Sequence, residues 1–335
     1  MGKKLAEQTV AQKRKKRAVV ADKKRVDSLV IENEKLALEI EAIKALSKNK
    51  STSAFNIVPV EDTTEAVAVV LASDWHIEEP VKKASVNGLN EYNLAIAEQR
   101  VIEFFGNTVK LLKKEQVDVR IDTLVLWLGG DFISNNIHDV LLETNQLSPI
   151  EAILLAQTWL ENGIRYLLAN TDVKLIIPCS VGNHSRITQK VHINTESGNS
   201  LEAYMYHMLA KHIQDDRVQF IINESYFTYI DIFGMTLCFH HGHAHKYNSG
   251  VGGLYIPVRR AIGQWNQKRR VDLWVFGHFH SYIQDPAFVC NGSLIGWNAY
   301  ADRLNVNYEP PKQTFFLLDK KRKCRTVTMP IMFSV

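Results

Sequence analysis

Cysteine is scarce in this sequence, and no two cysteines are close enough to form a CxxC pair. The four cysteines are Cys179, Cys238, Cys290 and Cys324. This spacing excludes a zinc knuckle and does not resemble the disulfide framework of small secreted proteins. We therefore expect a reduced, cytoplasmic protein.

Long apolar runs are also missing. No stretch reaches the 18 or so apolar residues that a membrane-spanning helix needs, and the first residues lack the apolar core of a signal peptide. With 46% hydrophobic and 23% charged residues, the composition is that of a globular protein. A chain of 335 residues is long enough for one large domain or two ordinary ones. We expect no membrane association.

The charge is unevenly distributed. Residues 1–50 contain 14 Lys and Arg against 7 Asp and Glu, whereas the other residues carry a net charge of −3. A basic arm on a mildly acidic body indicates nucleic acid as a partner. The arm contains the basic cluster Lys13, Arg14, Lys15, Lys16 and Arg17. This cluster is either a solvated helix face or a phosphate-binding element, in which each neutralised phosphate releases counterions.

The same arm predicts a helix, because residues 3–47 contain neither Pro nor Gly and are rich in Ala, Leu, Lys and Glu. Two interleaved seven-residue spacings form an apolar seam with one polar position: Val26, Asn33 and Ile40, with Leu29, Leu36 and Ile43. The seam predicts either a short dimeric coiled coil over residues 26–46 or a solitary amphipathic helix. We divide the chain into the arm (1–48), a linker (49–64) and a catalytic body (65–335).

The body alternates apolar runs with helical segments, which predicts an α/β fold. The expected strands are Ala66–Ala72, Thr123–Leu128 and Val173–Cys179, and the expected helices are Asn93–Lys113, Pro149–Ala169 and Asn199–Ile213. Shorter strands follow, which predict a second, partly antiparallel sheet: Gln219–Ile222, Tyr226–Ile232, Met235–His240 and Leu273–Phe276.

Five of the expected strands end at Asp, Asn or His. The motifs at these ends are Asp74-Trp-His76, Gly-Gly-Asp131, Gly-Asn183-His184, His240-His241-Gly-His243 and Gly-His278-Phe-His280. Ligands gather at the carboxyl edge of open α/β sheets. In the first and last motifs the polar residues are two apart, so on extended backbone both side chains would point to one side.

Carboxylate, amide and imidazole groups together are ligands for Mn²⁺, Fe or Zn²⁺ rather than Ca²⁺. A carboxylate can bridge two cations, and two metals about 3.5–4 Å apart can hold a bridging hydroxide and clamp a phosphoryl group. Any one of the motifs alone would be weak evidence, but five in order predict a two-metal phosphoesterase.

These motifs resemble those of the calcineurin-like metallophosphoesterase superfamily: DxH, GD, GNH, a strand ending in His, and GHxH. The resemblance covers about residues 65–300, and the chain is similar in look to double-strand-break-repair exonucleases and phage-type DNA exonuclease or phosphoesterase proteins. It implies a four-layer α/β/β/α sandwich, in which two packed mixed sheets are flanked by helices. In this chain a further N-terminal helix precedes it.

The resemblance also implies roles for individual residues. One metal ion would be bound by Asp74, His76 and His280, and the other by Asn183, His241 and His278, with Asp131 bridging. His184 would contact phosphate and protonate the leaving oxygen, a role suited to imidazole near neutral pH. The family pattern selects His241 over His240 as the ligand. We expect two divalent ions, Mn²⁺ first, with Fe or Zn²⁺ as alternatives.

Three further residues are candidate substrate contacts. Arg186 stands near the place where many relatives carry an acidic residue, so it is either a phosphate-binding cation or a solvated loop residue. His138 lies in the loop beyond Asp131, and His243 follows the fourth motif. We expect both to lie near the substrate.

The segment from Tyr255 to Arg270 interleaves aromatic residues with cations, including Arg259 and Arg260. Cations can follow a phosphate backbone while aromatic rings stack on bases. The alternative is an ordinary amphipathic helix with Trp265 buried. Together with the arm, this segment favours a nuclease or phosphodiesterase acting on nucleic acid, with DNA as the expected partner. The alternatives are a phosphatase for a small molecule or protein, or a non-catalytic DNA-binding subunit.

Overall fold

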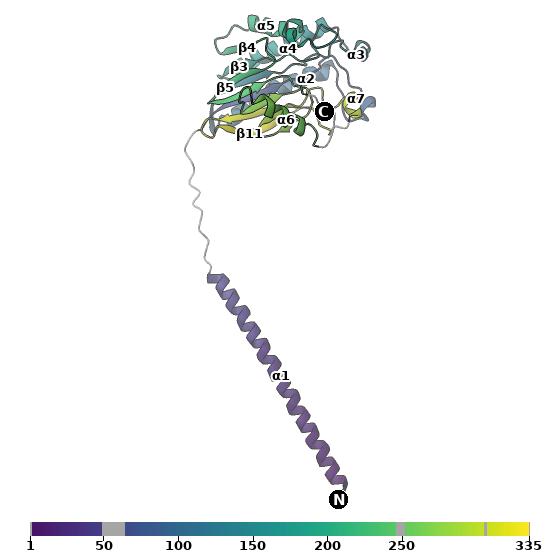
Figure 1. Cartoon of the computed structure of the whole chain (residues 1–335), viewed down its shortest axis with the longest axis vertical. Coiled ribbons are helices and arrows are strands. Elements are labelled where there is room, and N and C mark those ends of the chain that lie inside the picture. Colours follow the sequence, from purple (N-terminus) through teal and green to yellow (C-terminus); the bar gives the residue numbers. More distant parts are fainter. Residues whose placement is uncertain (1, 49–63, 246–251, 305–306, 335) are drawn as a thin grey trace. The chain divides into compact units, whose positions relative to one another are not determined.

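The computed structural model describes residues 2–48, 64–245, 252–304 and 307–334 (Figure 1). The chain divides into two units, Met1–Glu61 and Asp62–Val335. The predicted linker over residues 49–64 lies, apart from Thr64, outside the described residues. In the part of the chain that is described, no helix combines the length and apolarity needed to cross a membrane.

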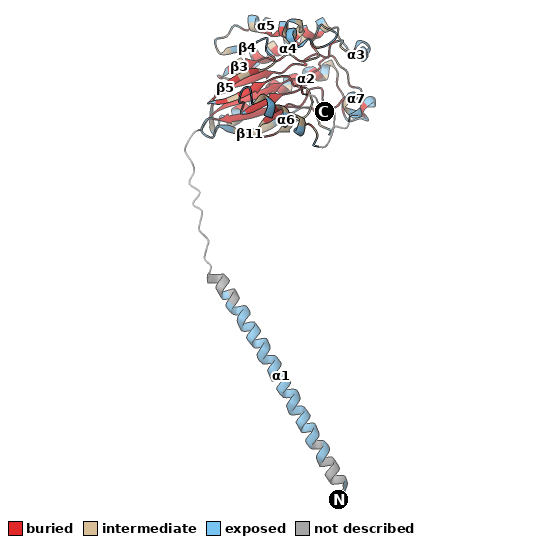
Figure 2. Ribbon diagram, viewed as in Figure 1, coloured by how far each residue is buried: buried red, intermediate tan, exposed pale blue. Residues whose placement is uncertain are grey.

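The first unit contains the predicted N-terminal helix, α1 (Gly2–Lys48). Every side chain of α1 whose burial is described is exposed, as Figure 2 shows. Several of these exposed residues are apolar, among them Val26, Leu29 and Leu36. The described part of the apolar seam therefore has no partner among the described residues of its own unit.

The second unit contains two mixed sheets. The six-stranded sheet has the order β11-β10-β1-β2-β3-β4, in which β1 to β4 run parallel and β10 is antiparallel to both of its neighbours. Its strands are β1 (Thr64–Ala72), β2 (Val119–Leu128), β3 (Lys174–Pro178), β4 (Val218–Ile221), β10 (Lys312–Asp319) and β11 (Cys324–Met332).

The five-stranded sheet has the order β5-β6-β7-β9-β8, with β6, β7 and β9 parallel and the two edge strands antiparallel. Its strands are β5 (Thr228–Ile232), β6 (Met235–Phe239), β7 (Leu273–Phe276), β8 (Ile283–Gln284) and β9 (Phe288–Cys290). Strands β8 to β11 were not predicted from the sequence.

The alternation of side chains along β1 explains how the layers pack. Val67, Val69 and Leu71 face the second sheet and form a core with residues such as Leu237 and Val275. The other face of β1 packs with the helices α2 (Leu94–Glu115), α4 (Pro149–Asn170) and α5 (Leu201–His212). A third core joins the outer face of the second sheet to α6 (Tyr255–Trp265). The predicted α/β/β/α sandwich is therefore confirmed (Figure 1).

Local sequence accounts for the helix starts. Ser148 and Glu151 form a capping box at the start of α4, with Pro149 in the first turn. At the starts of α2 and α5, the side chains of Asn93 and Ser200 accept hydrogen bonds from the backbone N–H groups of Ile96 and Ala203. The short helices are α3 (Asp139–Thr144) and α7 (Ala299–Arg303), and the 3-10 turns are Lys83–Val86, Ile193–Thr195 and Ser197–Asn199.

Candidate metal centre

The polar motifs converge because the strands that precede them are parallel neighbours. In the first sheet, Asp74 and His76 follow β1, Asp131 follows β2, and Asn183 follows β3. In the second sheet, the remaining residues follow two parallel strands, with His241 after β6 and His278 and His280 after β7. The carboxyl ends of five strands therefore bring the predicted ligands together.

The backbone at this edge is not extended, and the expectation of extended DxH and HxH segments was wrong. Asp74, His76, Asp131, His278 and His280 all have left-handed backbone, with φ between 49° and 70°. Non-glycine residues rarely adopt this conformation, which costs about 1–3 kcal/mol each and persists only where the surroundings enforce it. The strain is concentrated on the residues whose side chains meet at the site.

Two glycines allow the loops to come close. A Cβ atom on Gly182 would lie 2.1 Å from Asp131 Oδ1, and one on Gly277 would lie 2.3 Å from Asp74 Oδ2. Both distances are far shorter than any contact that such atoms can make. Glycine beside Asn183 and His278 is therefore required by the approach of the two carboxylates.

The predicted ligands form two groups. Asp74, His76 and His280 offer ligand atoms that all lie within 4.8 Å of one another, and Asp131, His241 and His278 do the same. His241 Nε2 lies 3.0 Å from Asp131 Oδ2, and the other ring nitrogen, Nδ1, donates to the carbonyl of Gly129. This arrangement leaves Nε2 as the atom of His241 that faces the site.

Two contacts show that the residues suit bound cations. His76 Nε2 and His280 Nε2 are only 3.2 Å apart, and two imidazole lone pairs at this distance repel unless a cation or a proton lies between them. Asn183 Oδ1 is buried without a hydrogen-bond partner among the described residues, which is costly unless a ligand satisfies it. The donor set of carboxylate, amide and imidazole fits two divalent metal ions.

Burial determines the protonation of the metal-free histidines. It lowers the pKa of His76 and His278 well below the ordinary value, and that of His280 to about 4. Neutral imidazole is the form that binds metal ions. For His241, burial acts in the same direction, but the Asp131 carboxylate, together with Asp74 and the carbonyl of Gly129, outweighs it and raises the pKa to about 10. A cation beside Asp131 is therefore favoured, as a proton or as a metal ion.

Asp74 and Asp131, the carboxylates of the two ligand groups, have pKa values shifted in opposite directions. Burial raises the pKa of Asp74 to about 7, despite the opposing effect of His241. Burial would also raise the pKa of Asp131, but His241 and His184 lower it well below its usual range. Asp131 is thus the carboxylate of the site that the surrounding histidines keep ionised.

His184 lies beside the two groups without belonging to either. Its ring is 4.8 Å from that of His76, its backbone N–H donates to Asp131 Oδ1 at 2.9 Å, and its Nδ1 lies 2.9 Å from the carbonyl oxygen of Ser134. A carbonyl only accepts hydrogen bonds, so Nδ1 carries the hydrogen, and Nε2 takes no part in this contact.

The three candidate substrate contacts, Arg186, His138 and His243, have different surroundings. Arg186 folds back on its own loop and donates to the carbonyl of Asn183. His138 is exposed, with its ring 6.1 Å from that of His184. His243 Nε2 lies 2.8 Å from Glu196 Oε1, and its ring is 5.5 Å from that of His241.

His240 occupies a different environment from His241. It is fully buried, and its ring stacks on Phe276 at a centroid distance of 5.4 Å. Trp265 packs on the same cluster, 5.0 Å from the rings of both Phe227 and Trp274. Trp265 therefore packs on this cluster, although its side chain is only partly buried and not buried as the amphipathic-helix alternative predicted.

The expected nucleic-acid contacts are exposed. The five cations of the cluster Lys13–Arg17 lie on the surface of α1. On α6, Arg259 is bound to Asp285 at 2.7 Å, whereas Arg260 is exposed and forms no ion pair with another described residue. Arg260 is thus the more available of the two for a phosphate.

Several residues that shape the site have no counterpart among the predicted site residues. Glu202 is fully buried, and its two oxygens accept hydrogen bonds from the backbone N–H groups of Phe132 and Gly182, both at 2.8 Å. Glu78 Oε1 accepts from the N–H groups of Ser134 and Asn135. These carboxylates fix the loops that carry Asp131 and Asn183. No sequence signal distinguishes Glu202, because an acidic residue in a first helical turn is ordinarily exposed.

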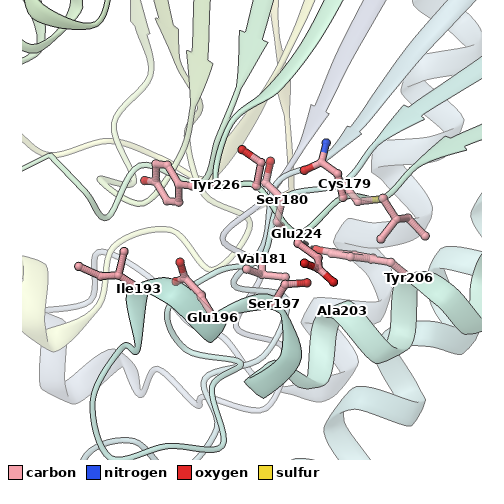
Figure 3. A pocket seen from close by; sticks show the side chains of 13 residues that line it. Cys179, Ser180, Val181, Ile193, Glu196, Ser197, Ala203, Tyr206, Glu224 and Tyr226 are labelled. Carbon is pink, nitrogen blue, oxygen red and sulfur yellow. Dashed lines mark hydrogen bonds between the residues drawn. The ribbon is translucent and has the colours of Figure 1, made fainter.

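Figure 3 shows a pocket whose lining includes Val181, in the loop that carries Asn183. Its lining includes Glu196, Glu224, Tyr206 and Tyr226 and none of the residues of the two ligand groups. Glu196 connects it to the centre through its contact with His243. The hydroxyl of Tyr226 accepts hydrogen bonds from the N–H groups of Gly242 and Ala244, which holds the His243 loop in place.

Comparison with known proteins finds no matching family model and no matching curated protein. Among solved structures, Vacuolar Protein Sorting 29 from Cryptosporidium parvum is 11% identical, over 80% of this chain and 99% of that chain, with a TM-score of 0.35. A predicted phosphoesterase from Streptococcus pneumoniae is 10% identical over 80% and 99%, with a TM-score of 0.28. A 5'-nucleotidase from Staphylococcus aureus is 9% identical over 81% and 55%, with a TM-score of 0.34. Likenesses this distant assign no activity, so the function must be inferred from the geometry of the site.

Proposed function

We propose that this chain is a two-metal-dependent phosphoester hydrolase of the calcineurin-like metallophosphoesterase type. The observation that carries the proposal is the meeting of two three-residue ligand groups at the carboxyl ends of strands from both sheets, with the charged carboxylate of Asp131 in one of them and a histidine outside both. When bound there, two divalent ions supply Lewis acidity towards a phosphoryl oxygen and activate water. The mixed N and O donors favour Mn²⁺, with Fe or Zn²⁺ as alternatives.

His184 acts as the general acid in this proposal. Because Nδ1 is held by the carbonyl of Ser134, a second proton on the ring must reside on Nε2. From there it can be given to the leaving oxygen of a substrate bound beside His76. The hydrogen bond from its backbone to Asp131 keeps the ring at a fixed position relative to the ligands.

We further propose that the substrate is nucleic acid. The support is the exposed cluster Lys13–Arg17 on a helix of a separate unit, together with exposed Arg260 on α6. Cations spaced along a helix neutralise several phosphates of one backbone at once. Since Trp265 is partly buried against a core, this proposal depends on the cations and not on base stacking.

The hydrolase proposal is tested with bis(p-nitrophenyl) phosphate and purified full-length protein. We expect turnover with Mn²⁺ that EDTA abolishes, and its loss in Asp131→Asn. The matched control is Asp139→Asn, which removes an exposed carboxylate at the start of α3 and should retain wild-type turnover. A wild-type protein that is inactive with Mn²⁺, Fe²⁺ and Zn²⁺ would contradict the proposal.

A further inference from the structure

Ser134 connects a predicted metal ligand to a carboxylate outside the centre. The residue is fully buried in the loop between β2 and α3. Its Oγ lies 2.8 Å from His76 Nδ1 and donates a hydrogen bond of 2.8 Å to Glu79 Oε2. His76, Ser134 and Glu79 therefore form one chain of contacts.

The direction of these hydrogen bonds follows from counting hydrogens. A serine hydroxyl has one hydrogen, and an ionised carboxylate can only accept. The hydrogen of Ser134 is therefore used on Glu79, and its Oγ can only accept from His76. It follows that Nδ1 of His76 carries the hydrogen, so the lone pair of the neutral ring is on Nε2.

Nε2 is also the nitrogen that faces the centre. It lies 3.2 Å from Nε2 of His280, in the group that also contains Asp74. The ring of His76 is thus held both in the orientation and in the tautomer that a metal ligand requires. A neighbouring group that takes the second N–H of a ligating histidine fixes both properties.

Glu79 is itself held in place. Its other oxygen, Oε1, accepts a hydrogen bond of 3.1 Å from the side-chain amide of Asn298, the cap of α7. The backbone N–H of Ser134 donates to Glu78 Oε1 at 2.8 Å, which fixes the main chain of the loop. The carboxylate therefore points towards Ser134 in a defined orientation.

We infer that Glu79 and Ser134 are positioning residues that hold His76 in the Nδ1–H tautomer and so direct Nε2 to the metal ion shared with Asp74 and His280. The inference rests on the proposed function, because it assigns a metal ion to that group. It also describes the metal-free protein, where the tautomer is set before any metal binds.

Glu79→Gln tests the inference because it reverses the direction of the hydrogen bonds that connect residue 79, Ser134 and His76. The amide oxygen of the glutamine must accept from Asn298, so its NH₂ faces Ser134 and donates to Oγ. The serine hydrogen then turns to Nδ1 of His76, and the ring hydrogen moves to Nε2, the position that the metal needs. Ser134→Ala removes both contacts without reversing them and should have a smaller effect. The matched control is Glu143→Gln, which removes an exposed carboxylate on α3.

The first measurement is the ¹⁵N spectrum of the histidine rings in the metal-free, full-length protein at one fixed pH. We expect His76 as the Nδ1–H tautomer in wild type and Glu143→Gln, and as Nε2–H in Glu79→Gln. A wild-type ring with its hydrogen on Nε2 would overturn the inference without the use of any variant.

The second measurement is calorimetric titration of the same proteins with Mn²⁺. We expect two sites in wild type, and in Glu79→Gln a loss of affinity of about 10- to 100-fold at one of them. Equal affinities in wild type and a folded Glu79→Gln would overturn the inference while leaving the hydrolase proposal intact. A wild type that binds no metal would instead contradict the hydrolase proposal, and the tautomer measurement would still stand.

Discussion

The backbone N–H of His184 donates a hydrogen bond of 2.9 Å to Oδ1 of Asp131, whose Oδ2 lies 3.0 Å from His241 Nε2. One carboxylate is thus shared between a ligand group and the loop of the proposed acid. Glu202 spans the same two loops through Phe132 and Gly182. Three hydrogen bonds therefore fix the loop of the proposed acid relative to the loop of Asp131.

His184→Gln should separate proton transfer from metal binding. His184 belongs to neither ligand group, so the variant should bind Mn²⁺ as wild type does. Its kcat should fall by about 10²- to 10⁴-fold on a diester with an alkoxide leaving group. The decrease should be smaller for p-nitrophenolate, which leaves without a proton. Steady-state kinetics with both substrates check this, with His207→Gln, an exposed residue of α5, as the control. Equal losses on both substrates would argue against an acid role.

The raised pKa of Glu78 predicts that the stability difference between wild type and Glu78→Gln depends on pH. Burial raises its pKa from the ordinary 4.5 to about 7. Between these values the folded state holds a proton that the unfolded chain has lost, so the contribution of Glu78 to stability decreases as the pH rises through this range. Glu78→Gln mimics the protonated form, since its amide oxygen can still accept from Ser134 and Asn135.

The EDTA-treated variant should therefore gain stability relative to wild type between pH 5 and pH 8, by up to about 3 kcal/mol. Chemical unfolding at several pH values measures the difference, and Glu143→Gln should show none of this trend. If the free energy of unfolding changed with pH in the same way for wild type and Glu78→Gln, the carboxyl group of Glu78 would titrate normally in the folded state.

The position of the site could be predicted from the sequence, because strand ends are visible as apolar runs that stop at a polar residue. Asp74, Asp131 and Asn183 follow three such runs, and the parallel order of β1, β2 and β3 brings them together. The backbone conformation was not predictable. The left-handed φ of Asp74 accompanies backbone hydrogen bonds to Gly130 and from Leu294, two residues far away in the sequence.

The residues that support the site were not predictable either. Glu79 and Ser134 meet only after β2 has placed its loop beside that of β1, and neither belongs to a motif. Strands β10 and β11 do have a sequence signal, since an apolar run over residues 315–318 is followed by the basic turn Lys320–Lys323. That pattern is typical of a hairpin. None of the five polar motifs lies at the end of β10 or β11. The motifs therefore do not reveal that these two strands exist.

The seam of α1 predicts a homodimer through residues 26–46. Leu36 and Leu38 are both exposed, but only Leu36 lies on the seam; Ile43, also a seam residue, lies outside the side chains that the structure describes. Leu36→Lys should convert a dimer to a monomer at micromolar concentration, because a charge at a d position opposes apolar packing. Leu38→Lys, the same change on the opposite face, should leave the dimer intact. Sedimentation equilibrium measures both, and a monomeric wild type would exclude the coiled coil.

The cluster Lys13–Arg17 should contribute affinity for DNA without affecting the chemistry. With all five residues changed to Ala, the helix is retained because Ala is a strong helix former. The slope of log affinity against log salt should decrease by about 0.7–0.9 for each phosphate that the arm no longer neutralises. Turnover of bis(p-nitrophenyl) phosphate should remain at the wild-type level, because this substrate offers no extended backbone to the arm.

The control for this experiment replaces three exposed lysines of the body, Lys110, Lys113 and Lys114 on α2, by Ala. If binding depended on net charge alone, the control would lose affinity in proportion to the charge removed. If it depends on the arm, only the five-residue variant should weaken and show the smaller salt slope. Unchanged affinity and slope in that variant would remove the arm from the nucleic-acid proposal and favour a small-molecule or protein substrate.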